Sequence, residues 1–294
     1  MLMTPALCAQ QSSDNEFSFQ NAAPLYPPDT GPIVCIDSAH YNYHTATGRY
    51  KPFADLISGD GFQVQSLQAL FTLDALADCT VLVVANALSE QNRNDWSYPH
   101  NSAFTRGEID ALQPWVRNGG NMLLIADHAP FAGAAADLAA VFALLMQDVY
   151  SVQAPGETDI FSTEQNTLGE HPILAGRDNA ESINRLATFT GQPFRTLGNW
   201  QPLLIFGPGS LAYINPQQSF QEQNAAIDAF SVNGWTHAAA RELQQGRLVV
   251  LGEAAMCSAQ IAANGIAMGM NHPEAGQNAQ FCLNIIRWLS RAIN

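Results

Sequence analysis

The stretch 121-NMLLIADH-128 decides the fold, because it is a short, continuously apolar run that ends in an aspartate and a histidine. Such a run suits a strand buried on both faces, as in a parallel sheet. An amphipathic pattern over 105–120 precedes it, and Glu108 stands three residues after Thr105, the capping-box spacing of a helix start. An alanine-rich helical pattern over 132–145 follows it. The order helix, strand, helix is typical of an α/β protein.

The same alternation recurs on both sides of this unit. Strands are predicted at the apolar runs 31–37, 62–67, 80–85 and 246–253. Helices are predicted at 49–58 and 277–293, the second with one apolar face. Strands that alternate with helices predict a doubly wound, mostly parallel central sheet.

The remaining segments divide the chain into an arm, a core and an insertion. Residues 1–30 are polar and proline-rich and form the predicted N-terminal arm. Residues 150–245 are rich in Gly, Pro, Asn and Gln, and their two short apolar runs could form an antiparallel extension or the far edge of the sheet. Because the strand and helix after residue 245 complete the first layer, we expect 31–294 to be a single α/β domain with an irregular insertion near 150–245.

Composition and charge exclude several classes of partner. The 294 residues are 47% hydrophobic, enough for a substantial core, and no run reaches the roughly 18 apolar residues of a membrane span. The net charge is −14 and Lys51 is the only lysine. Such a balance repels phosphate backbones and offers no basic face to anionic lipid, so we expect neither nucleic acid nor a membrane as partner.

The N-terminus and the cysteines bear on the cellular compartment. Residues 1–9, MLMTPALCA, resemble the tail of a signal peptide, with Ala9 as a cleavage point, and the alternative is a frayed tail. The first reading predicts a periplasmic or secreted protein. The five cysteines match no zinc spacing. We predict that Cys35, within a strand, and Cys282, within a helix, are small buried thiols.

Three predicted strands end in ionisable residues, at Asp37, at Asp127–His128 and at Glu253. In open parallel sheets, ligands bind outside the carboxyl ends of the strands. A charged group after so apolar a run is costly unless it lies at a mouth or finds a partner. Each carboxylate could instead cap the next helix. Because three strands end alike, we favour a functional site at this edge.

The most distinctive local pattern is Asp37-x-x-His40-x-x-x-His44. If the segment turns helical, these spacings place the three side chains on one face. They could then bind a divalent metal such as zinc. In the alternative, Tyr41 and Tyr43 line a substrate pocket together with His44, and His40 bonds to backbone.

Two kinds of catalysis fit the strand ends. Ser38 could be a nucleophile with His128 as its base and Glu253 or Asp127 orienting that base, although the chain lacks a G-x-S-x-G elbow. Alternatively, a carboxylate activates water and His128 acts as the acid. In the Gly-rich loop before the last helix, Asn271 and Gln277 could bind substrate.

Several of these motifs resemble a known family. The strand-Asp-x-x-His pattern, 123-LLIADHAPFAGAAADLA-139, 166-NTLGEHPILAGR-177 and the final 277-QNAQFCLNIIRWL-289 resemble a mostly bacterial family of unknown activity in the class I glutamine amidotransferase-like superfamily. They are also similar to trehalose-utilisation-type proteins. The resemblance covers roughly residues 31–291 and implies a flavodoxin-like three-layer sandwich. The superfamily's reactive cysteine is missing, since Asp127-His128 stands in its place, so glutamine amidotransfer is not expected.

Together these patterns predict a hydrolase that acts on a small neutral substrate, an ester or a glycoside. The residues expected to carry it are Asp37, His40, His44, Asp127, His128 and Glu253. The acidic surface argues against an anionic substrate. A non-catalytic domain that binds carbohydrate or peptide in the same crevice is the alternative, and a scaffold domain is a third reading. The sequence leaves the oligomeric state open.

Overall fold

The structure is a computed structural model, and it describes residues 11–152, 158–214 and 229–294. A central sheet runs through it in the strand order β3-β2-β4-β5-β15-β14-β10-β6, with β11 paired to β14. Five neighbouring strands are parallel to one another. They are β3 (Gln63–Leu67), β2 (Ile33–Asp37), β4 (Val81–Ala85), β5 (Asn121–Ile125) and β15 (Gly246–Leu251). The predicted α/β fold with a mostly parallel sheet is therefore confirmed.

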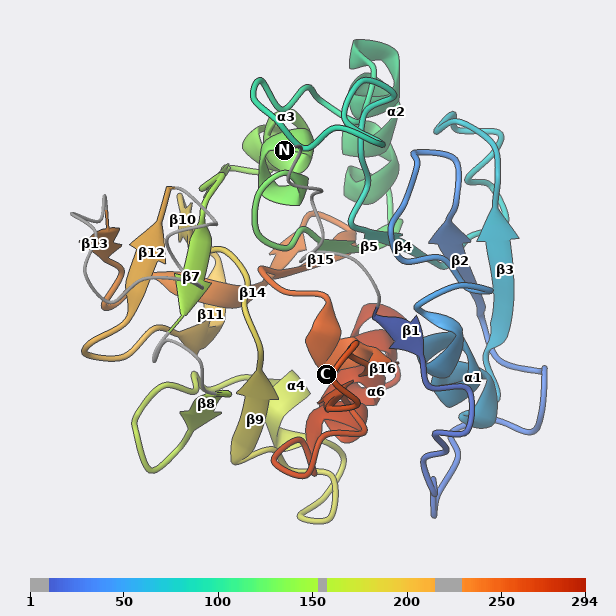
Figure 1. Cartoon of the computed structure of the whole chain (residues 1–294). Coiled ribbons are helices and arrows are strands. Elements are labelled where there is room, and N and C mark those ends of the chain that lie inside the picture. Colours follow the sequence, from blue (N-terminus) through green and yellow to red (C-terminus); the bar gives the residue numbers. More distant parts are fainter. Residues whose placement is uncertain (1–10, 153–157, 215–228) are drawn as a thin grey trace.

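Helices cover both faces of the sheet and complete the three layers (Figure 1). In the view of Figure 1, α2 (Arg106–Arg117) and α3 (Phe131–Val141) lie above the sheet, and α1 (Lys51–Gly59) and α6 (Asn278–Leu289) lie below it. Strand β4 shows why two layers are needed, because all five of its residues are buried. Its alternate side chains enter two different hydrophobic clusters, one on each face of the sheet.

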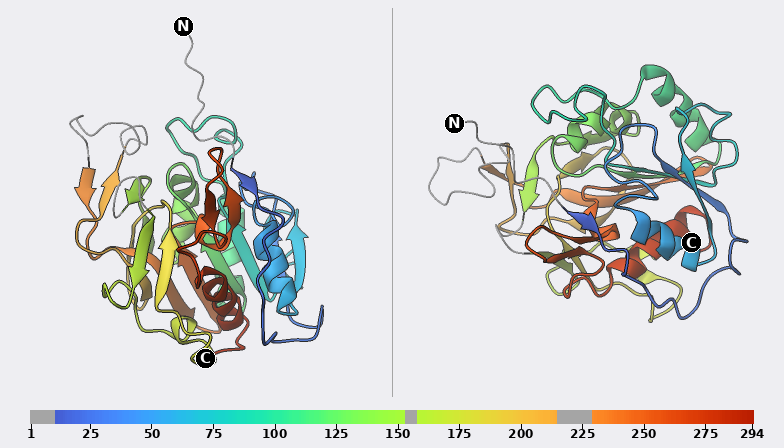
Figure 2. Two further views of the ribbon diagram at one scale, coloured as in Figure 1. Left: turned by 60° about the horizontal axis from the view of Figure 1, so that its bottom comes forward. Right: turned by 45° about the vertical axis from the view of Figure 1, so that its right-hand side comes forward.

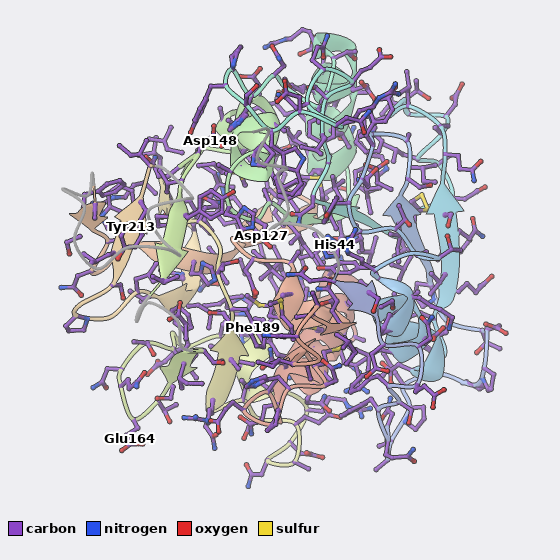
Figure 3. All side chains as sticks on the ribbon, viewed as in Figure 1. His44, Asp127, Asp148, Glu164, Phe189 and Tyr213 are labelled. Carbon is purple, nitrogen blue, oxygen red and sulfur yellow. A yellow bond between two sulfur atoms is a disulfide. The ribbon has the colours of Figure 1, made fainter. Side chains whose placement is uncertain are left out.

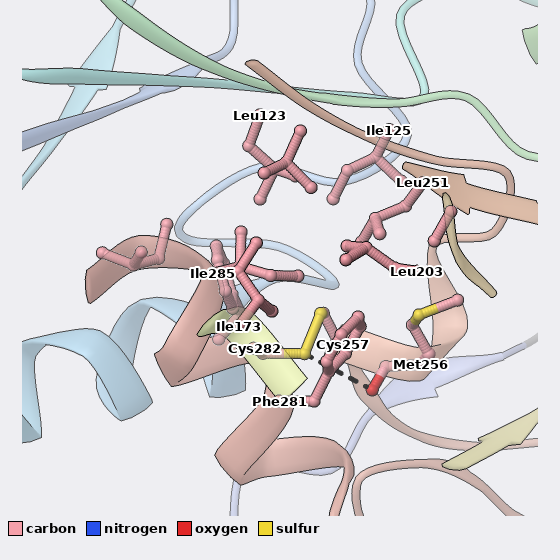
Figure 4. Packing of buried hydrophobic residues seen from close by; sticks show 14 of the residues in the cluster. Leu123, Ile125, Ile173, Leu203, Leu251, Met256, Cys257, Phe281, Cys282 and Ile285 are labelled. Atoms are coloured by element: carbon pink, nitrogen blue, oxygen red, sulfur yellow. Dashed lines mark hydrogen bonds between the residues drawn. A yellow bond between two sulfur atoms is a disulfide. The ribbon is translucent and has the colours of Figure 1, made fainter. Parts of the chain in front are cut away.

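A disulfide cross-links the core below the sheet (Figure 4). Cys257, in the 3-10 helix η1 (Ala255–Cys257), is bonded to Cys282 of α6. Cys35 of β2 is bonded to Cys79, which lies just before β4. The predicted buried thiols at Cys35 and Cys282 are therefore wrong. The spacing of the cysteines in the sequence does not show which of them are bonded. The parallel pairing of β2 with β4 brings Cys35 and Cys79 together.

One predicted helix is too long. The pattern over 132–145 predicted a single helix, but α3 ends at Val141. Ala143 adopts a left-handed φ of 64°, which breaks the helix, and the chain turns back as strand β6 (Leu144–Met146). Strand β6 then pairs with β10 (Phe194–Thr196) at the edge of the central sheet.

The insertion forms antiparallel structure. Strands β10, β11 (Gln201–Ile205) and β14 (Thr236–Leu243) extend the central sheet. A three-stranded sheet joins β7 (Tyr150–Val152), β12 (Leu211–Tyr213) and β13 (Ala229–Ser231), and a two-stranded sheet joins β8 (Asp159–Ser162) to β9 (Arg185–Thr188). The short helix α4 (Pro172–Ala175) packs against α6. Of the two short apolar runs in this region, 202-PLLIF-206 extends the central sheet as β11, whereas 210-SLAYI-214 lies in the separate three-stranded sheet as β12.

The described part of the N-terminal arm is bound to the body of the protein. Strand β1 (Ser12–Ser13) pairs with β16 (Ala259–Ile261), which also pairs with β17 (Ala267–Gly269) (Figure 2). Further along the arm, Asn21 and the backbone of Leu25 donate hydrogen bonds to Asp60. The predicted signal-peptide remnant at residues 1–9 lies outside the described residues. Within the described residues, no helix has the length and apolar character needed to span a membrane.

Candidate functional site

The parallel register aligns the carboxyl ends of the central strands. Val83 is level with Leu123, and Leu123 is level with Val249, so β4, β5 and β15 end at one edge. The polar residues predicted for that edge are there and are almost entirely buried, with Asp37 and Glu253 both 0% exposed. They form a hydrogen-bonded cluster around His40 and a second, looser group around Asp127, rather than the single group of six side chains that the sequence predicted.

The first group, the His40 cluster, consists of Asp37, His40 and Glu108. His40 Nδ1 donates to the Asp37 carboxylate at 2.9 Å, and His40 Nε2 donates to Glu108 Oε1 at 2.6 Å. Burial alone would lower the pKa of His40, but the hydrogen bonds and charges of Asp37 and Glu108 outweigh it, so the pKa is raised. The sequence identified Glu108 only as a capping residue, which it is, because Thr105 and Glu108 form the predicted capping box.

The predicted metal ligands do not fit a metal ion. Both ring nitrogens of His40 are used in the His40 cluster, and His44 bonds elsewhere. The part of the chain that the structure describes contains no group of three or more His, Cys, Asp or Glu side chains placed to hold a metal ion. The Asp37-x-x-His40 spacing instead serves a buried ion pair.

The second group, the central polar group, consists of His44, Asn86, Asp127, His128 and Glu253. Asn86 follows β4 in a left-handed conformation, with φ 49°. Its Oδ1 accepts from the backbone N–H of Asp127 at 3.0 Å, and its Nδ2 donates to His44 Nδ1 at 3.3 Å. Since a backbone N–H can only donate, the Asn86 amide has one orientation, and His44 Nδ1 must be the acceptor.

His44 therefore carries its proton on Nε2, and among the described residues this buried N–H has no hydrogen-bond partner. Burial, followed by the charges of Arg49 and His128, lowers the pKa of His44 to about 3. The ring stays uncharged at neutral pH. Figure 3 shows His44 and Asp127 near the centre of the view, where the central strands end. His44 thus offers a fixed, uncharged N–H donor.

His128 has the opposite tautomer. Its Nδ1 donates to the carbonyl of Ala129 at 2.7 Å, so Nε2 is an acceptor whenever the ring carries a single proton. The ring stacks on Tyr150 at 4.1 Å, and the side chain is 17% exposed. Nε2 lies 4.0 Å from Asp127 Oδ1, too far for a hydrogen bond. Asp127 accepts instead from the backbone N–H groups of His128 and Ala254.

Glu253 is held by backbone rather than by His128. Its two oxygens accept from the N–H groups of Phe189 at 3.2 Å and Met256 at 2.9 Å. Burial, and then the negative charge of Asp127, raises the pKa of Glu253 well above its ordinary value, despite these two hydrogen bonds. The predicted role of Glu253 as the hydrogen-bonded partner of His128 is thus not seen, but its carboxyl group favours the protonated form.

Two more buried side chains, Tyr50 and His237, belong to the surroundings of Asp127, and they were not identified from the sequence. Tyr50 donates to the carbonyl of Ala254 at 2.9 Å, and burial, Glu253 and Asp127 raise its pKa. His237, at the start of β14, donates from Nδ1 to the carbonyl of Gln192 and leaves a buried Nε2 without a partner. Tyr50 lay in a predicted helix and His237 in the irregular insertion, so no local pattern marked either residue.

The other predicted site residues near β2 have separate environments. Ser38 Oγ donates to the carbonyl of Leu67 and makes no hydrogen bond to His128. Tyr41 is exposed, with Arg93 over its ring. Tyr43 is half-buried and contacts Phe131 and Trp96, both of which also contact His128. Of these three, only Tyr43 adjoins the central polar group.

Asn271 and Gln277 hold the fold together. Asn271 Nδ2 donates to Asp14 of the arm and to the carbonyl of Gln260 in β16. Gln277 accepts from the backbone of Asn184 and Arg185 and donates to that of Ser182. Two surface hollows also lie away from the strand ends, one between α2 and α3 and one between the arm and α1.

Comparison with known proteins finds solved structures with a similar fold. No family model and no curated protein matches the chain. Among solved structures, the mmIFT52 N-terminal domain matches with a TM-score of 0.60 at 14% identity, over 88% of this chain and 97% of that domain. Cytoplasmic protein STM1381 from Salmonella typhimurium LT2 matches with a TM-score of 0.50 at 15% identity, over 88% and 99%. A ThuA-like protein from Bacteroides uniformis matches with a TM-score of 0.47 at 11% identity, over 92% and 94%.

Identities this low show the fold alone. The chain shares the α/β fold of the mmIFT52 N-terminal domain and of STM1381.

Proposed function

We propose that the protein is a hydrolase of small esters or glycosides, with its reaction centre in the central polar group. The observation that carries the proposal is the opposite tautomers of His44 and His128. One buried ring offers an N–H donor that lacks a partner, and the other, partly exposed, offers a free acceptor nitrogen. A hydrolase needs both functions, a base for water and a donor for the negative charge that develops in the transition state.

Each side chain then has a defined role. His128 Nε2 takes a proton from the attacking water, while Tyr150 and the Ala129 carbonyl fix its ring. His44 Nε2–H hydrogen-bonds to the oxygen on which charge develops. Glu253, whose raised pKa favours the protonated form, gives its proton to the leaving group. The neighbouring carboxyls Asp127 and Glu253 have different surroundings, which is how enzymes divide acid and base roles between such pairs.

We also propose that the protein is periplasmic or secreted. The structure contains two disulfides, Cys35–Cys79 and Cys257–Cys282. Disulfides persist in oxidising compartments and are rare in the reducing cytosol.

The test is turnover of 4-nitrophenyl esters and glycosides by the purified protein. His128→Ala should lower kcat/KM by about 100-fold or more, because general-base catalysis contributes that much. His171→Asn is the matched control, since His171 caps α4 away from the strand ends and asparagine also caps helices. Equal activity of His128→Ala and wild type would contradict the proposal.

A carbohydrate- or peptide-binding domain without catalysis is the second candidate. The partly exposed aromatic rings of Tyr43 and Trp96 favour it, because they contact each other and Trp96 also contacts His128. Such rings bind the apolar faces of sugars and peptide side chains. Binding of the panel compounds without any turnover, unchanged in His128→Ala, would support this candidate against the hydrolase.

A further inference from the structure

Arg49 is a cation without a carboxylate partner beside the central polar group. Its guanidinium carbon lies 3.8 Å from the centre of the Tyr43 ring, and Nη2 donates to the Tyr43 hydroxyl at 3.2 Å. Nε is buried and has no hydrogen-bond partner. Within the described ranges, no aspartate or glutamate forms an ion pair with it. Arginine has five N–H donors, so most of the capacity of Arg49 is unused.

The composition of the chain makes this isolation informative. The chain has 26 acidic residues against 12 lysines and arginines, so carboxylates are abundant. Five of the eleven arginines form ion pairs, namely Arg106, Arg177, Arg185, Arg247 and Arg287, and among the described residues only Arg49 and Arg241 have a buried Nε without a partner. A partly buried guanidinium loses hydration, and that loss is costly unless an acceptor replaces the water.

The position of Arg49 connects it to the proposed reaction centre. Its charge is one of the causes, after burial, that lower the pKa of His44. The Tyr43 ring under the guanidinium contacts Trp96 and Phe131, each at 5.5 Å, and both of these rings contact His128. These rings thus form a continuous series of contacts from Arg49 to His128, in which Tyr43 and Trp96 are partly exposed and Phe131 is buried.

We infer that Arg49 binds a carboxylate group of the substrate beside the central polar group. The inference rests on the proposed function, and it names the substrate class as an ester or glycoside that carries one carboxylate. The planar guanidinium matches the two oxygens of a carboxylate. A phosphate dianion fits less well than a carboxylate, because the net charge of −14 disfavours two negative charges more than one. The substrate expected from the bulk charge was neutral, whereas the local charge favours an anion.

Matched substrate pairs test this inference. We would compare 4-nitrophenyl glucuronide with the glucoside, and 4-nitrophenyl hydrogen succinate with the butyrate. The wild type should prefer the acid-bearing member of a pair by about tenfold or more in kcat/KM, the gain expected of a charge-assisted pair. In Arg49→Met the ratio should fall to about one, and Arg49→Lys should keep an intermediate ratio because its charge lacks the fork.

The control is Arg93→Met, which removes the same charge from an arginine that also lies over a tyrosine ring, that of Tyr41. It should keep the wild-type ratio. A ratio in Arg49→Met equal to that of the wild type, or a wild-type preference for the neutral members, would overturn the inference.

A binding experiment separates failure of this inference from failure of the proposed hydrolase. Glutarate binding is measured by calorimetry in wild type, His128→Ala and Arg49→Met. Binding in the first two proteins and its loss in the third would support the carboxylate subsite even if no ester or glycoside is turned over. Glutarate binding that survives in Arg49→Met, or equal binding of inorganic phosphate by the wild type, would refute it.

Discussion

The side-chain amide of Asn86 fixes the tautomer of His44. Asn86 Oδ1 is committed to the N–H of Asp127, so Nδ2 faces His44 Nδ1 at 3.3 Å and the imidazole proton must lie on Nε2. The residue that follows β4 thereby links the backbone after β5 to the ring of a histidine from the loop after β2. A donor with no partner in a buried site costs free energy, so its retention favours a role in binding.

Replacement of Asn86 by aspartate should reverse this tautomer. In Asn86→Asp both side-chain oxygens accept, so His44 Nδ1 must become the donor and Nε2 loses its proton. The new carboxylate should also raise the pKa of His44 from about 3, because it favours the charged ring. Long-range proton–nitrogen NMR of the imidazole nitrogens reports both changes. Asn86→Ser is the control, since it neither adds charge nor supplies an amide. A His44 spectrum identical in Asn86→Asp and wild type would show that Asn86 does not set the tautomer.

The His40 cluster predicts a pH-dependent stability. Because the pKa of His40 is raised in the folded state, its contribution is fully present below the unfolded value of 6.5 and is lost as the pH rises through the raised folded value. His40→Gln cannot be charged and breaks a buried pair, which costs about 3 to 5 kcal/mol when one partner is removed. Urea denaturation of both proteins across the range above pH 6.5 should show this difference shrinking as the pH increases. A difference that is constant with pH would mean that His40 is uncharged in the folded protein.

Most of the scaffold could be predicted from the sequence, because its signals are local. Continuous apolar runs identify β4, β5 and β15, and the Thr105–Glu108 spacing identifies the start of α2. The end of α3 could not be predicted, since alanine-rich sequence favours helix and only tertiary pairing of β6 with β10 explains the left-handed turn at Ala143.

The sequence predicted where the strand-end side chains lie, but not which groups they form hydrogen bonds with. The strand ends at Asp127 and Glu253 do lie together, because parallel strands in register must end at one edge. The partners that determine their chemistry come from remote segments. Glu108 is 68 residues from His40, and Tyr50 reaches Ala254 across 204 residues. No spacing rule on a single sequence encodes such contacts.

The two disulfides should contribute unequally to stability. Cys35–Cys79 joins residues 44 apart and Cys257–Cys282 joins residues 25 apart, and a longer closed loop restricts the unfolded chain more. Each bridge should be worth about 3 to 4 kcal/mol, with the first the larger. Urea denaturation of Cys35→Ala/Cys79→Ala and of Cys257→Ala/Cys282→Ala measures both losses. Wild-type protein in reducing agent is the reference. A wild-type midpoint that does not change on reduction would contradict the prediction.

Gln277 was a predicted substrate-binding residue, and its contacts in the structure instead predict a structural role. Its side chain bonds to the backbone of Ser182, Asn184 and Arg185, which ties the start of α6 to the segment entering β9. Gln277→Ala removes three hydrogen bonds to exposed or partly buried backbone groups and should cost about 0.5 to 1.5 kcal/mol. The exposed Gln165 makes no side-chain hydrogen bond in the described structure, so Gln165→Ala should stay within about 0.5 kcal/mol of wild type.

Thermal and urea denaturation give the stability of both glutamine variants, and steady-state kinetics on the 4-nitrophenyl panel give KM. The structural role predicts lower stability for Gln277→Ala with an unchanged KM, because the contacts that it breaks are to backbone and not to the central polar group. A raised KM with unchanged stability would instead restore Gln277 to the substrate site. That outcome would also require the loop before α6 to lie within reach of His128, and so would relocate the bound substrate toward β9.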